Sequence, residues 1–225
     1  ALKHVPMVEF NMFEGMFTNV IGTKNVADAA NKALVSTFVQ ISTDKAVNPS
    51  NIMGASKRIA ESYCQALDLE RGLNTTRFIT VRFGNVLGSA GSVVALFRDQ
   101  ISKGGPVTVT DPKMKRYFMT VREAVELVLA ASALGTTQPN QVGKIFVLEM
   151  GKPVLIQSLA EQMIRLAGHS PSKDIKIIHT GLRPGEKLFE EMFHDGEKLV
   201  ETSQSGVMLA APRVVDLEDI ILQID

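Results

Sequence analysis

Cysteine, surplus charge and long apolar runs are all scarce in this sequence, and each scarcity excludes a class of site or of protein. Cys64 is the only cysteine in 225 residues, so an intrachain disulfide and a Cys-based zinc site are excluded, and a reducing compartment fits best. Lys plus Arg number 24 and Asp plus Glu number 24, so the formal net charge is zero. This balance argues against proteins that coat nucleic acid or bind membranes through basic patches. No apolar run reaches the ~18 residues that a membrane span needs.

The composition that is present is that of a globular protein with a packed core. Apolar residues make up 45% and charged residues 21% of the chain. At roughly 150 residues per domain, the length corresponds to between one and two domains. The chain opens Ala-Leu-Lys-His-Val-Pro, without an initiator methionine, and we therefore expect it to be a piece of a longer protein.

Helical and strand-like periodicities alternate along the chain. Helical spacing of apolar residues predicts helices over residues 18–33, 51–69, 92–102, 121–134 and 156–166. Short apolar runs predict strands over residues 36–43, 77–83, 144–149 and 175–178. Strands that alternate with helices of this length indicate crossover units, so we predict an α/β fold with a mostly parallel, Rossmann-like sheet.

The pattern loosens after residue 103, where Gly and Pro become more frequent, as in Gly104-Gly105-Pro106. We therefore expect residues 1–103 to belong to the main sheet domain. Residues 104–225 are expected to form mainly a smaller α/β lobe, with some segments returning to the main sheet.

A polar cluster follows the first predicted strand. Ser42, Thr43, Asp44 and Lys45 come at its carboxyl end, which is the edge where open α/β sheets bind ligands. Asp44 beside Lys45 offers a proton donor or acceptor next to an amine. A surface ion pair in a loop explains these residues about equally well.

A second pair opens the next helix. Met53 and Lys57 stand four residues apart and therefore share a helical face. By itself this pair is typical of a core methionine and a solvated lysine. Only two tyrosines, Tyr63 and Tyr117, occur in the chain, and neither has a lysine four residues later.

The strings around these residues resemble the nucleotide-sugar 4,6-dehydratases of bacterial polysaccharide biosynthesis, which are extended short-chain dehydrogenases acting on UDP-N-acetylglucosamine. The resemblance rests on residues 42–61 (STDKAVNPSNIMGASKRIAE), 81–94 (VRFGNVLGSAGSVV), 106–111 (PVTVTD), 116–120 (RYFMT), 145–151 (IFVLEMG) and 181–188 (GLRPGEKL). It covers nearly the whole chain, in the order that the family has. Met53 matches the large, often membrane-anchored branch, in which methionine replaces the tyrosine of the Tyr-x-x-x-Lys pattern.

The resemblance implies NAD as cofactor, although the usual pyrophosphate turn is missing from this chain. Family members begin with a strand, a Gly-x-Gly-x-x-Gly turn and a helix. The glycines Gly84, Gly88 and Gly91 are spaced four and three apart, so they do not form this turn. We therefore expect the chain to be the second half of the catalytic domain.

The resemblance also assigns catalytic roles. Oxidation at C4 acidifies the C5 hydrogen, water leaves across C5 and C6, and a hydride returns to C6. Lys45 corresponds to the base at C5 and Asp44 to the acid for the departing hydroxyl. With no tyrosine available, Thr43 is the candidate that relays the C4 hydroxyl proton, supported by Lys57 or a water chain. As a base, Lys45 needs desolvation or a nearby cation, and full exposure would weaken its assignment.

Further residues are expected to bind cofactor or substrate. Lys57, Ser42, Asn19 and Lys3 are the cofactor candidates, although Asn19 is equally typical of a cap or a packing residue. The substrate candidates are Asn85, Ser89, Ser92, Arg116, Arg183 and Glu186. The arginines suit a diphosphate because a guanidinium donates two hydrogen bonds to phosphate oxygens, and the alternative for each is a surface ion pair. His169, His179 and His194 lack ligand spacing, so no metal site is predicted.

Two other functions compete with this dehydratase. One is a nucleotide-sugar epimerase or a C5-inverting dehydratase on the same scaffold, although Met53 counts against simple 4-epimerisation. The other is a fragment that binds sugar nucleotides without catalysis. The resemblance further implies a UDP-sugar substrate, no nucleic-acid partner, self-association, and an anchor in upstream segments. It places the protein in the cytoplasm or at the cytoplasmic face of the inner membrane.

Overall fold

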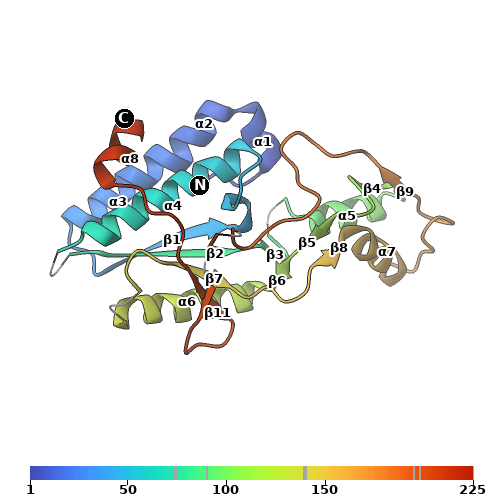
Figure 1. Cartoon of the computed structure of the whole chain (residues 1–225). Coiled ribbons are helices and arrows are strands. Elements are labelled where there is room, and N and C mark those ends of the chain that lie inside the picture. The colour runs from blue at the N-terminus through green and yellow to red at the C-terminus, as the bar shows by residue number, and fades with distance from the viewer. Residues whose placement is uncertain (73–74, 90, 139–140, 195, 198, 225) are drawn as a thin grey trace.

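The centre of the fold is a five-stranded sheet (Figure 1). The computed structural model describes residues 1–72, 75–89, 91–138, 141–194, 196–197 and 199–224. In the sheet, β1 (Thr37–Thr43), β2 (Arg77–Phe83) and β7 (Ile145–Leu148) run parallel. The sheet continues with β11 (Val207–Ala210) and β10 (Leu199–Glu201), which run antiparallel. The register pairs Thr43 with Phe83, so the ends of β1 and β2 lie side by side.

Helices cover both faces of this sheet, as continuous apolar strands require. On one face lie α3 (Gly22–Lys32) and α4 (Ile52–Glu70), and on the other lies α6 (Val121–Thr137) (Figure 1). The C-terminal α8 (Leu217–Ile224) packs on α4. Before α3 come α1 (Val5–Phe10), α2 (Met12–Met16) and a π-helical turn, η1 (Phe17–Ile21). Within the described ranges, no helix combines the length and the apolar character that crossing a bilayer requires.

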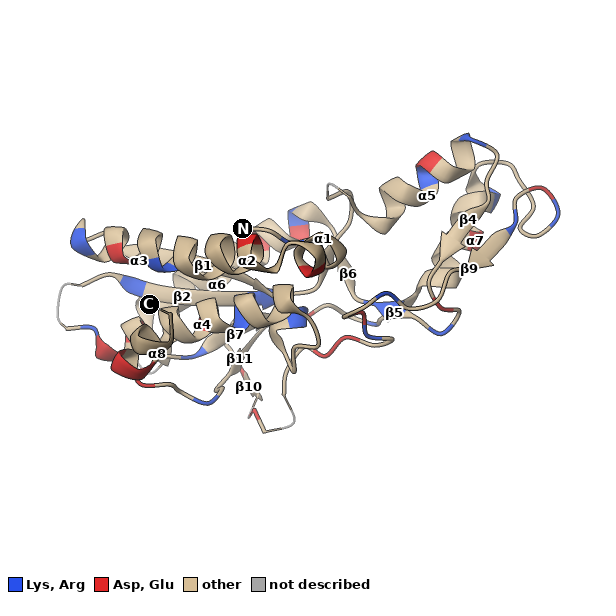
Figure 2. Cartoon of the chain, turned by 90° about the horizontal axis from the view of Figure 1, so that it is seen from above, with Lys and Arg blue, Asp and Glu red and all other residues tan. Residues whose placement is uncertain are grey.

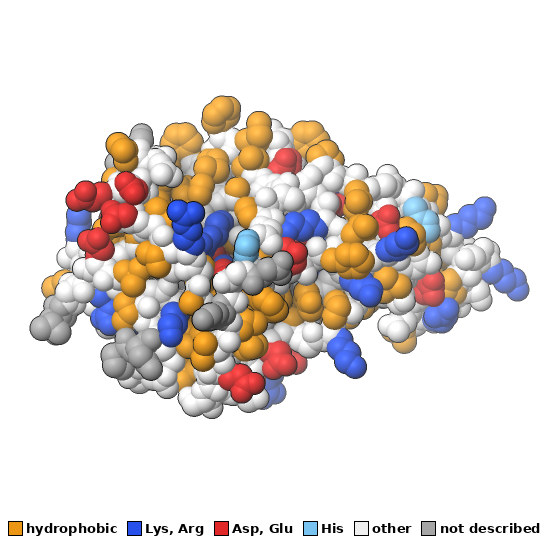
Figure 3. All heavy atoms as spheres, in the orientation of Figure 1, with side chains coloured by type: hydrophobic (Ala, Val, Ile, Leu, Met, Phe, Trp, Pro, Cys, Tyr) orange, Lys and Arg blue, Asp and Glu red, His pale blue; other side chains and the backbone are white. Residues whose placement is uncertain are grey.

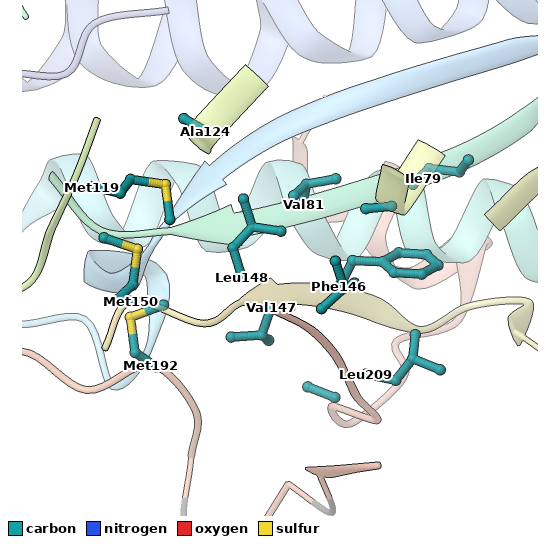
Figure 4. Packing of buried hydrophobic residues seen from close by; sticks show 13 residues of the cluster. Ile79, Val81, Met119, Ala124, Phe146, Val147, Leu148, Met150, Met192 and Leu209 are labelled. Atoms are coloured by element: carbon teal, nitrogen blue, oxygen red, sulfur yellow. The ribbon is translucent and has the colours of Figure 1, made fainter. Parts of the chain in front are cut away.

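The main core lies between the sheet and α6. Ile79 and Val81 of β2 pack with Phe146 and Leu148 of β7 (Figure 4). All four are fully buried. Each such side chain stabilises the fold by about 1.5–3 kcal/mol relative to an exposed one. This core holds β2 and β7 in place and thereby fixes the sheet edge at which they end.

A smaller cluster lies at one end of the molecule (Figure 2). It contains α5 (Val93–Ser102), β4 (Val107–Val109), α7 (Ile156–Leu166) and β9 (Ile177–His179), with Phe97, Val107 and Ile164 in its own core. Two pairs of two-residue strands lie where the chain crosses between the two parts. In one pair β3 (Asn85–Val86) lies beside β6 (Phe118–Met119), and in the other β5 (Lys115–Arg116) lies beside β8 (Val154–Leu155). The chain enters this cluster at α5 and returns to the main sheet at β7 and again at β10 and β11.

A buried ion pair fastens α4 to the sheet. Arg82 of β2 is 1% exposed and donates to both carboxylate oxygens of Glu61 on α4, at 3.1 and 2.8 Å. It also donates to Glu197 Oε2 at 3.1 Å. Burial alone would raise the pKa of Glu61, but Arg82 and Arg58 hold that pKa below its ordinary value. The helix that carries Met53 and Lys57 is therefore fixed relative to β2.

The predicted α/β class is confirmed, and the strongly periodic elements lie where the sequence places them. The helix predicted over residues 156–166 has those bounds, and the strand over 77–83 does too. The sequence did not predict α1, α2, α8 or the antiparallel strands β10 and β11. The sheet is thus parallel over β1, β2 and β7 and antiparallel beyond β7.

Candidate active site

A cleft of about 850 Å³ lies at the carboxyl ends of β1 and β2. Twelve of the fourteen predicted site residues line it: Lys3, Ser42, Thr43, Lys45, Met53, Lys57, Asn85, Ser89, Ser92, Arg116, Arg183 and Glu186. The two that do not are Asn19 and Asp44. Leu96, Met114 and Ile156 of the smaller cluster form an apolar part of the wall. The fold therefore brings together residues that the sequence spreads over most of the chain.

Thr43, Asp44 and Lys45 form one hydrogen-bonded group. β1 ends at Thr43, and the chain turns through a short 3₁₀ helix, η2 (Asp44–Ala46). Asp44 Oδ1 accepts hydrogen bonds from Thr43 Oγ1 at 2.8 Å and from Lys45 Nζ at 2.9 Å. Asp44 is 0% exposed, and its Oδ2 has no hydrogen-bond partner among the described residues. Asp44 thus lies behind Thr43 and Lys45, which reach the cleft.

Asn85 fixes the other side of the Lys45 amine. Lys45 Nζ lies 3.4 Å from Asn85 Oδ1, while Asn85 Nδ2 donates to the Tyr117 carbonyl oxygen at 3.0 Å. The amide is thereby oriented with its oxygen toward the lysine. The Lys45 side chain is 15% exposed, so it is neither sealed in the core nor free in solvent. A neutral amine that donates to Asp44 Oδ1 and Asn85 Oδ1 keeps its lone pair for a proton from a ligand.

The start of α4 carries the second pair. Asn51 caps this helix by accepting a hydrogen bond from Gly54 N at 2.7 Å. Met53 is buried against the cleft, and Lys57, one turn later, donates to the Ile41 carbonyl oxygen at 3.1 Å. Burial lowers the pKa of Lys57, and the nearby Glu61 carboxylate opposes this effect. Lys57 is therefore a partly desolvated amine in the cleft, and the solvated lysine that the pair suggests by itself does not describe it.

Asn19 is buried behind the cleft. Its side chain accepts from Leu2 N at 2.7 Å and donates to the Leu2 carbonyl oxygen at 2.9 Å and to Ser56 Oγ at 3.0 Å. The π-helical turn η1 directs this amide inward, and such turns are frequent at functional sites. Asn19 therefore holds Leu2, and with it the neighbouring Lys3, at the cleft.

The remaining predicted residues also line the cleft. Ser92 caps α5 by accepting from Ala95 N at 3.5 Å, and Ser89 precedes it in the same loop. Glu186 accepts from Arg183 N at 3.2 Å, which closes a tight turn. The Arg183 side chain makes no hydrogen bond or ion pair with any part of the chain that the structure describes. Its guanidinium is therefore available to a ligand.

Arg116 is engaged by backbone rather than exposed. Its guanidinium donates to the carbonyl oxygens of Lys115 at 2.8 Å, Lys187 at 2.8 Å and Leu188 at 3.2 Å. It also lies 3.7 Å from Glu190 Oε1. The predicted alternative of a surface ion pair is wrong for Arg116, whose side chain is 11% exposed.

Three residues to which the sequence assigns no role in the site also shape it. Glu190 lines the cleft and is 9% exposed. A Cβ atom at Gly54 would lie 2.1 Å from the Lys45 carbonyl oxygen, and one at Gly84 would lie 3.1 Å from Asp44 Oδ2. A glycine in the first turn of a helix is a usable signal of such close approach. In the described residues, no group of three or more His, Cys, Asp or Glu side chains could hold a metal ion.

Relatives of known name match most of this chain. A family described as "Polysaccharide biosynthesis protein" matches residues 1–212. The capsular polysaccharide biosynthesis protein CapD of Staphylococcus aureus is 56% identical over 197 residues, which are 88% of this chain and 32% of that protein. The UDP-glucose 4-epimerase of Rickettsia canadensis is 41% identical over 192 residues, which are 85% of this chain and 53% of the epimerase. The chain therefore spans between a third and about half of the length of these relatives.

Solved structures share the fold. Pen of Bacillus thuringiensis superposes with a TM-score of 0.82 at 33% identity, over 100% of this chain and 72% of that one. The dTDP-glucose 4,6-dehydratase DesIV of Streptomyces venezuelae, solved with NAD and TYD, gives a TM-score of 0.72 at 18% identity. That match covers 85% of this chain and 62% of DesIV, and it shows the fold alone.

These matches confirm the family resemblance that was predicted from the motifs. The Rossmann-like α/β class is confirmed by the same structural neighbours. The family name and the names of these two sequence relatives concern polysaccharide biosynthesis or nucleotide-sugar conversion. This chain belongs to the polysaccharide biosynthesis protein family, among whose sequence relatives and fold neighbours are nucleotide-sugar epimerases and dehydratases.

Proposed function

We propose that the protein containing this chain dehydrates UDP-N-acetylglucosamine to a UDP-4-keto-6-deoxy-N-acetylhexosamine with NAD. Its product would serve capsule or other glycan synthesis, in the cytoplasm or at the cytoplasmic face of the inner membrane. One observation carries the proposal. The Lys45 amine, held by Asp44 and Asn85, lines the same cleft as Lys57 and Met53. A dehydratase needs a base for C5 in addition to the C4 chemistry, and Lys45 is placed to be that base.

Four of the predicted residues suit the nicotinamide ribose of NAD. Lys57 uses one ammonium proton on the Ile41 carbonyl oxygen, so two remain for ribose hydroxyls. Ser42 and Lys3 line the same cleft, and Asn19 holds the backbone next to Lys3. NAD supplies a hydride acceptor for C4 and a hydride donor for C6. Lys57, Ser42 and Lys3 would bind and orient it, and Asn19, which is buried behind the cleft, would position Lys3.

Proton transfer at C4 needs a substitute for tyrosine. Met53 has no exchangeable proton, so it contributes an apolar wall rather than an acid or base. Thr43 Oγ1 lies 2.8 Å from Asp44 Oδ1, and this carboxylate can accept the hydroxyl proton. We therefore assign to Thr43 the relay of the C4 hydroxyl proton, with Lys57 as the neighbouring cation.

Asp44, the acid implied by the resemblance, does not reach the cleft surface. Its Oδ1 already accepts from Thr43 and Lys45, and its side chain is fully buried. In the proposed reaction it first fixes these two groups. Any proton that it supplies must cross to the sugar through one of them.

The nucleotide diphosphate suits the part of the cleft that Arg183 and Glu186 line. The free guanidinium of Arg183 fits a phosphate, and Glu186 beside it can accept from a ribose hydroxyl. Ser89 and Ser92 lie at the N-terminal end of α5, where backbone N–H groups favour an anion. Asn85 and Arg116 would complete this set near the sugar.

Epimerisation is the second candidate, because an epimerase is 41% identical to this chain. A C5-inverting dehydratase would use the same Lys45 chemistry and differ only in the face of the ring that is reprotonated. Met53 in place of tyrosine and a fixed amine at Lys45 favour dehydration over simple 4-epimerisation.

Mass spectrometry and NMR of the product formed in heavy water separate these candidates. The complete product of the gene that encodes this chain is incubated with UDP-N-acetylglucosamine and NAD⁺ in D₂O. We expect a product that has lost one water and gained one deuterium at C5, and its configuration identifies inversion. A sugar isomer without water loss would support the epimerase instead. A sugar nucleotide that binds but is recovered unchanged would support the remaining candidate, which is binding without catalysis.

We also propose that the protein self-associates through its N-terminal helices. Phe10, Phe13 and Phe17 are 86%, 83% and 65% exposed, and together they form an apolar face on α1, α2 and η1. Figure 3 shows hydrophobic side chains gathered along the edge where α2 lies. Exposed apolar patches of this kind mark interfaces, and the occupant that we propose is a second copy of the chain.

Phe13→Glu should therefore reduce the mass of the assembly measured by light scattering after gel filtration. A charge on this face would be desolvated in the interface, which opposes association. Leu166→Glu, at an 88% exposed position on α7, is the control and should leave the mass unchanged. An unaltered mass for Phe13→Glu would show that this face does not join two copies.

A further inference from the structure

The loop that carries Glu190 is fastened beside the start of α4. Asn51 Nδ2 donates to the Gly185 carbonyl oxygen at 2.9 Å, and Lys187 Nζ donates to the Val47 carbonyl oxygen at 3.2 Å. These two bonds hold the loop next to the turn that follows β1. The loop therefore contributes to the wall of the same cleft as that turn.

Glu190 is a buried carboxyl group whose hydrogen-bonding capacity the described residues leave unused. Its side chain is 5% exposed, and it lines the cleft. Arg116 Nη2 lies 3.7 Å from Glu190 Oε1, which is longer than a hydrogen bond, and this guanidinium donates to backbone carbonyl oxygens instead. Within the described ranges, no donor reaches the Glu190 carboxyl group. A buried acceptor left in this way indicates a contact with a ligand.

The charges that act on Glu190 place it near the turn that follows β1. Burial raises the pKa of this carboxyl group above its ordinary value. Among the neighbouring charges, Lys45 has the largest effect on that pKa and lowers it. Asp44 raises the pKa, and Arg116 and Lys187 lower it. Because a charge acts most strongly at short range, Glu190 faces the part of the cleft that Lys45 reaches.

A carboxylate accepts hydrogen bonds and repels anions, which restricts what Glu190 can bind. It does not suit the diphosphate of a nucleotide sugar, for which Arg183 is the candidate. It suits a hydroxyl group or an amide N–H. Since Lys45 is proposed to act at C5 of the hexose, a donor beside it belongs to the hexose and not to the uridine.

The reaction leaves only two such donors of the hexose in place. The C4 hydroxyl is oxidised and the C6 hydroxyl departs, so neither can hold the sugar through every step. The C3 hydroxyl and the acetamido N–H on C2 remain. Around the ring, C3 is one bond nearer to C5 than C2 is. The C3 hydroxyl is therefore the remaining donor nearer to the atom on which Lys45 acts.

We propose that Glu190 accepts a hydrogen bond from the C3 hydroxyl of the hexose and thereby selects sugars in which that hydroxyl is present. This contact presupposes the proposed dehydration, in which Asp44 keeps the acid role that the resemblance implies. A sugar that lacks the hydroxyl leaves the buried carboxylate unpaired, and a site built in this way rejects such a sugar.

Glu190→Ala in the complete gene product should raise KM for UDP-N-acetylglucosamine about 10- to 100-fold, the range for losing a hydrogen bond to a charged group. The contact is the same before and during the reaction, so the loss should fall on KM rather than on kcat. UDP, used as a competitive inhibitor, has no hexose and should keep its wild-type Ki. Glu190→Gln retains an acceptor oxygen and should lie between the wild type and Glu190→Ala. Glu126→Ala, on the exposed face of α6, is the control for loss of one carboxylate.

The 3-deoxy analogue of UDP-N-acetylglucosamine identifies the hydroxyl that is bound. With this analogue, the wild-type protein should show about the same rise in KM that Glu190→Ala shows with the natural sugar. Glu190→Ala itself should use both sugars with similar KM values, because it lacks the acceptor that distinguishes them. The wild-type measurement needs no variant, so it tests the C3 contact even if Glu190→Ala does not fold.

Three results would contradict this contact. They are an unchanged KM of the wild type for the 3-deoxy sugar, undiminished discrimination by Glu190→Ala, and a rise in the Ki of UDP equal to the rise in KM. If the wild-type protein does not dehydrate the sugar at all, the proposed function fails, and this is seen without any variant. Calorimetry then tests the contact: the wild type should bind the natural sugar more tightly than the 3-deoxy sugar, and Glu190→Ala should bind both alike.

Discussion

Lys45→Gln should lower kcat for dehydration by about 10⁴-fold, the upper end of what a positioned base contributes. The glutamine amide can still donate to Asp44 Oδ1, which accepts from the Lys45 amine at 2.9 Å. The buried Asp44 carboxylate therefore keeps two donors, and the variant should remain folded. What the variant lacks is the amine that takes the C5 proton.

The readout that identifies this loss is the order of events rather than the rate alone. Oxidation at C4 does not need Lys45, so reduced cofactor should accumulate with the 4-keto sugar, and C5 should gain no deuterium in D₂O. Lys103→Gln is the matched control, because Lys103 also pairs with a nearby aspartate, at 2.7 Å from Asp99, but on the exposed surface. Wild-type exchange at C5 in Lys45→Gln would remove Lys45 from the role of base.

Gly54→Ala should inactivate the protein although Gly54 has no side chain to lose. An alanine Cβ would lie 2.1 Å from the Lys45 carbonyl oxygen and 3.0 Å from its carbonyl carbon. Both atoms are backbone, so no rotamer change relieves the clash. Either η2 or the first turn of α4 must move, and each carries catalytic candidates. Activity should fall below detection while the far faces of the fold stay intact.

The sign of the stability change follows from two opposing magnitudes. Alanine favours a helix over glycine by about 1 kcal/mol, whereas forcing an extra methyl group into a packed site costs about 1–3 kcal/mol. The free energy lost to the clash should exceed the gain in helix propensity, so thermal denaturation should show a lower Tm. At Gly72, no described atom lies within 4 Å of the position that a Cβ would take, so Gly72→Ala is the control. Full activity in Gly54→Ala would contradict this account of the close approach.

The elements that sequence reasoning found are those whose signal is local. Residues 77–83 form a continuous run of β-favouring types, and residues 156–166 show a clear helical period, so both could be bounded closely. The strand Val207–Ala210 is short and lacks alternation, and it exists because β7 offers an open edge. The helices α1 and α2 keep Phe10 and Phe13 exposed, so no amphipathic pattern predicts them.

In the site, too, sequence reasoning found the residues whose signal is local and missed those placed by distant contacts. Thr43, Asp44 and Lys45 are adjacent in sequence, and a strand end is enough to suggest them. Nothing in the sequence near Glu190 shows that its carboxyl group lies beside Lys45, because that placement depends on hydrogen bonds such as the one from Lys187 to Val47. Likewise, Gly84, which follows β2, leaves room for Asp44, because a Cβ atom there would lie 3.1 Å from Asp44 Oδ2. Motifs identify which residues meet, but not which of them reaches the ligand.

The buried Arg82 has a consequence for how a ligand enters. Through Glu61 it holds the helix that carries Lys57, and through Glu197 and the Met192 carbonyl oxygen it holds the far end of the segment that carries Glu190. Two sides of the cleft are thus tied to one guanidinium in the sheet. The part containing α5 and α7 has a separate core and is joined to the sheet by short strand pairs. We therefore expect any opening or closing of the cleft to come from movement of the part that contains α5 and α7. The sides of the cleft that Arg82 holds should keep their positions.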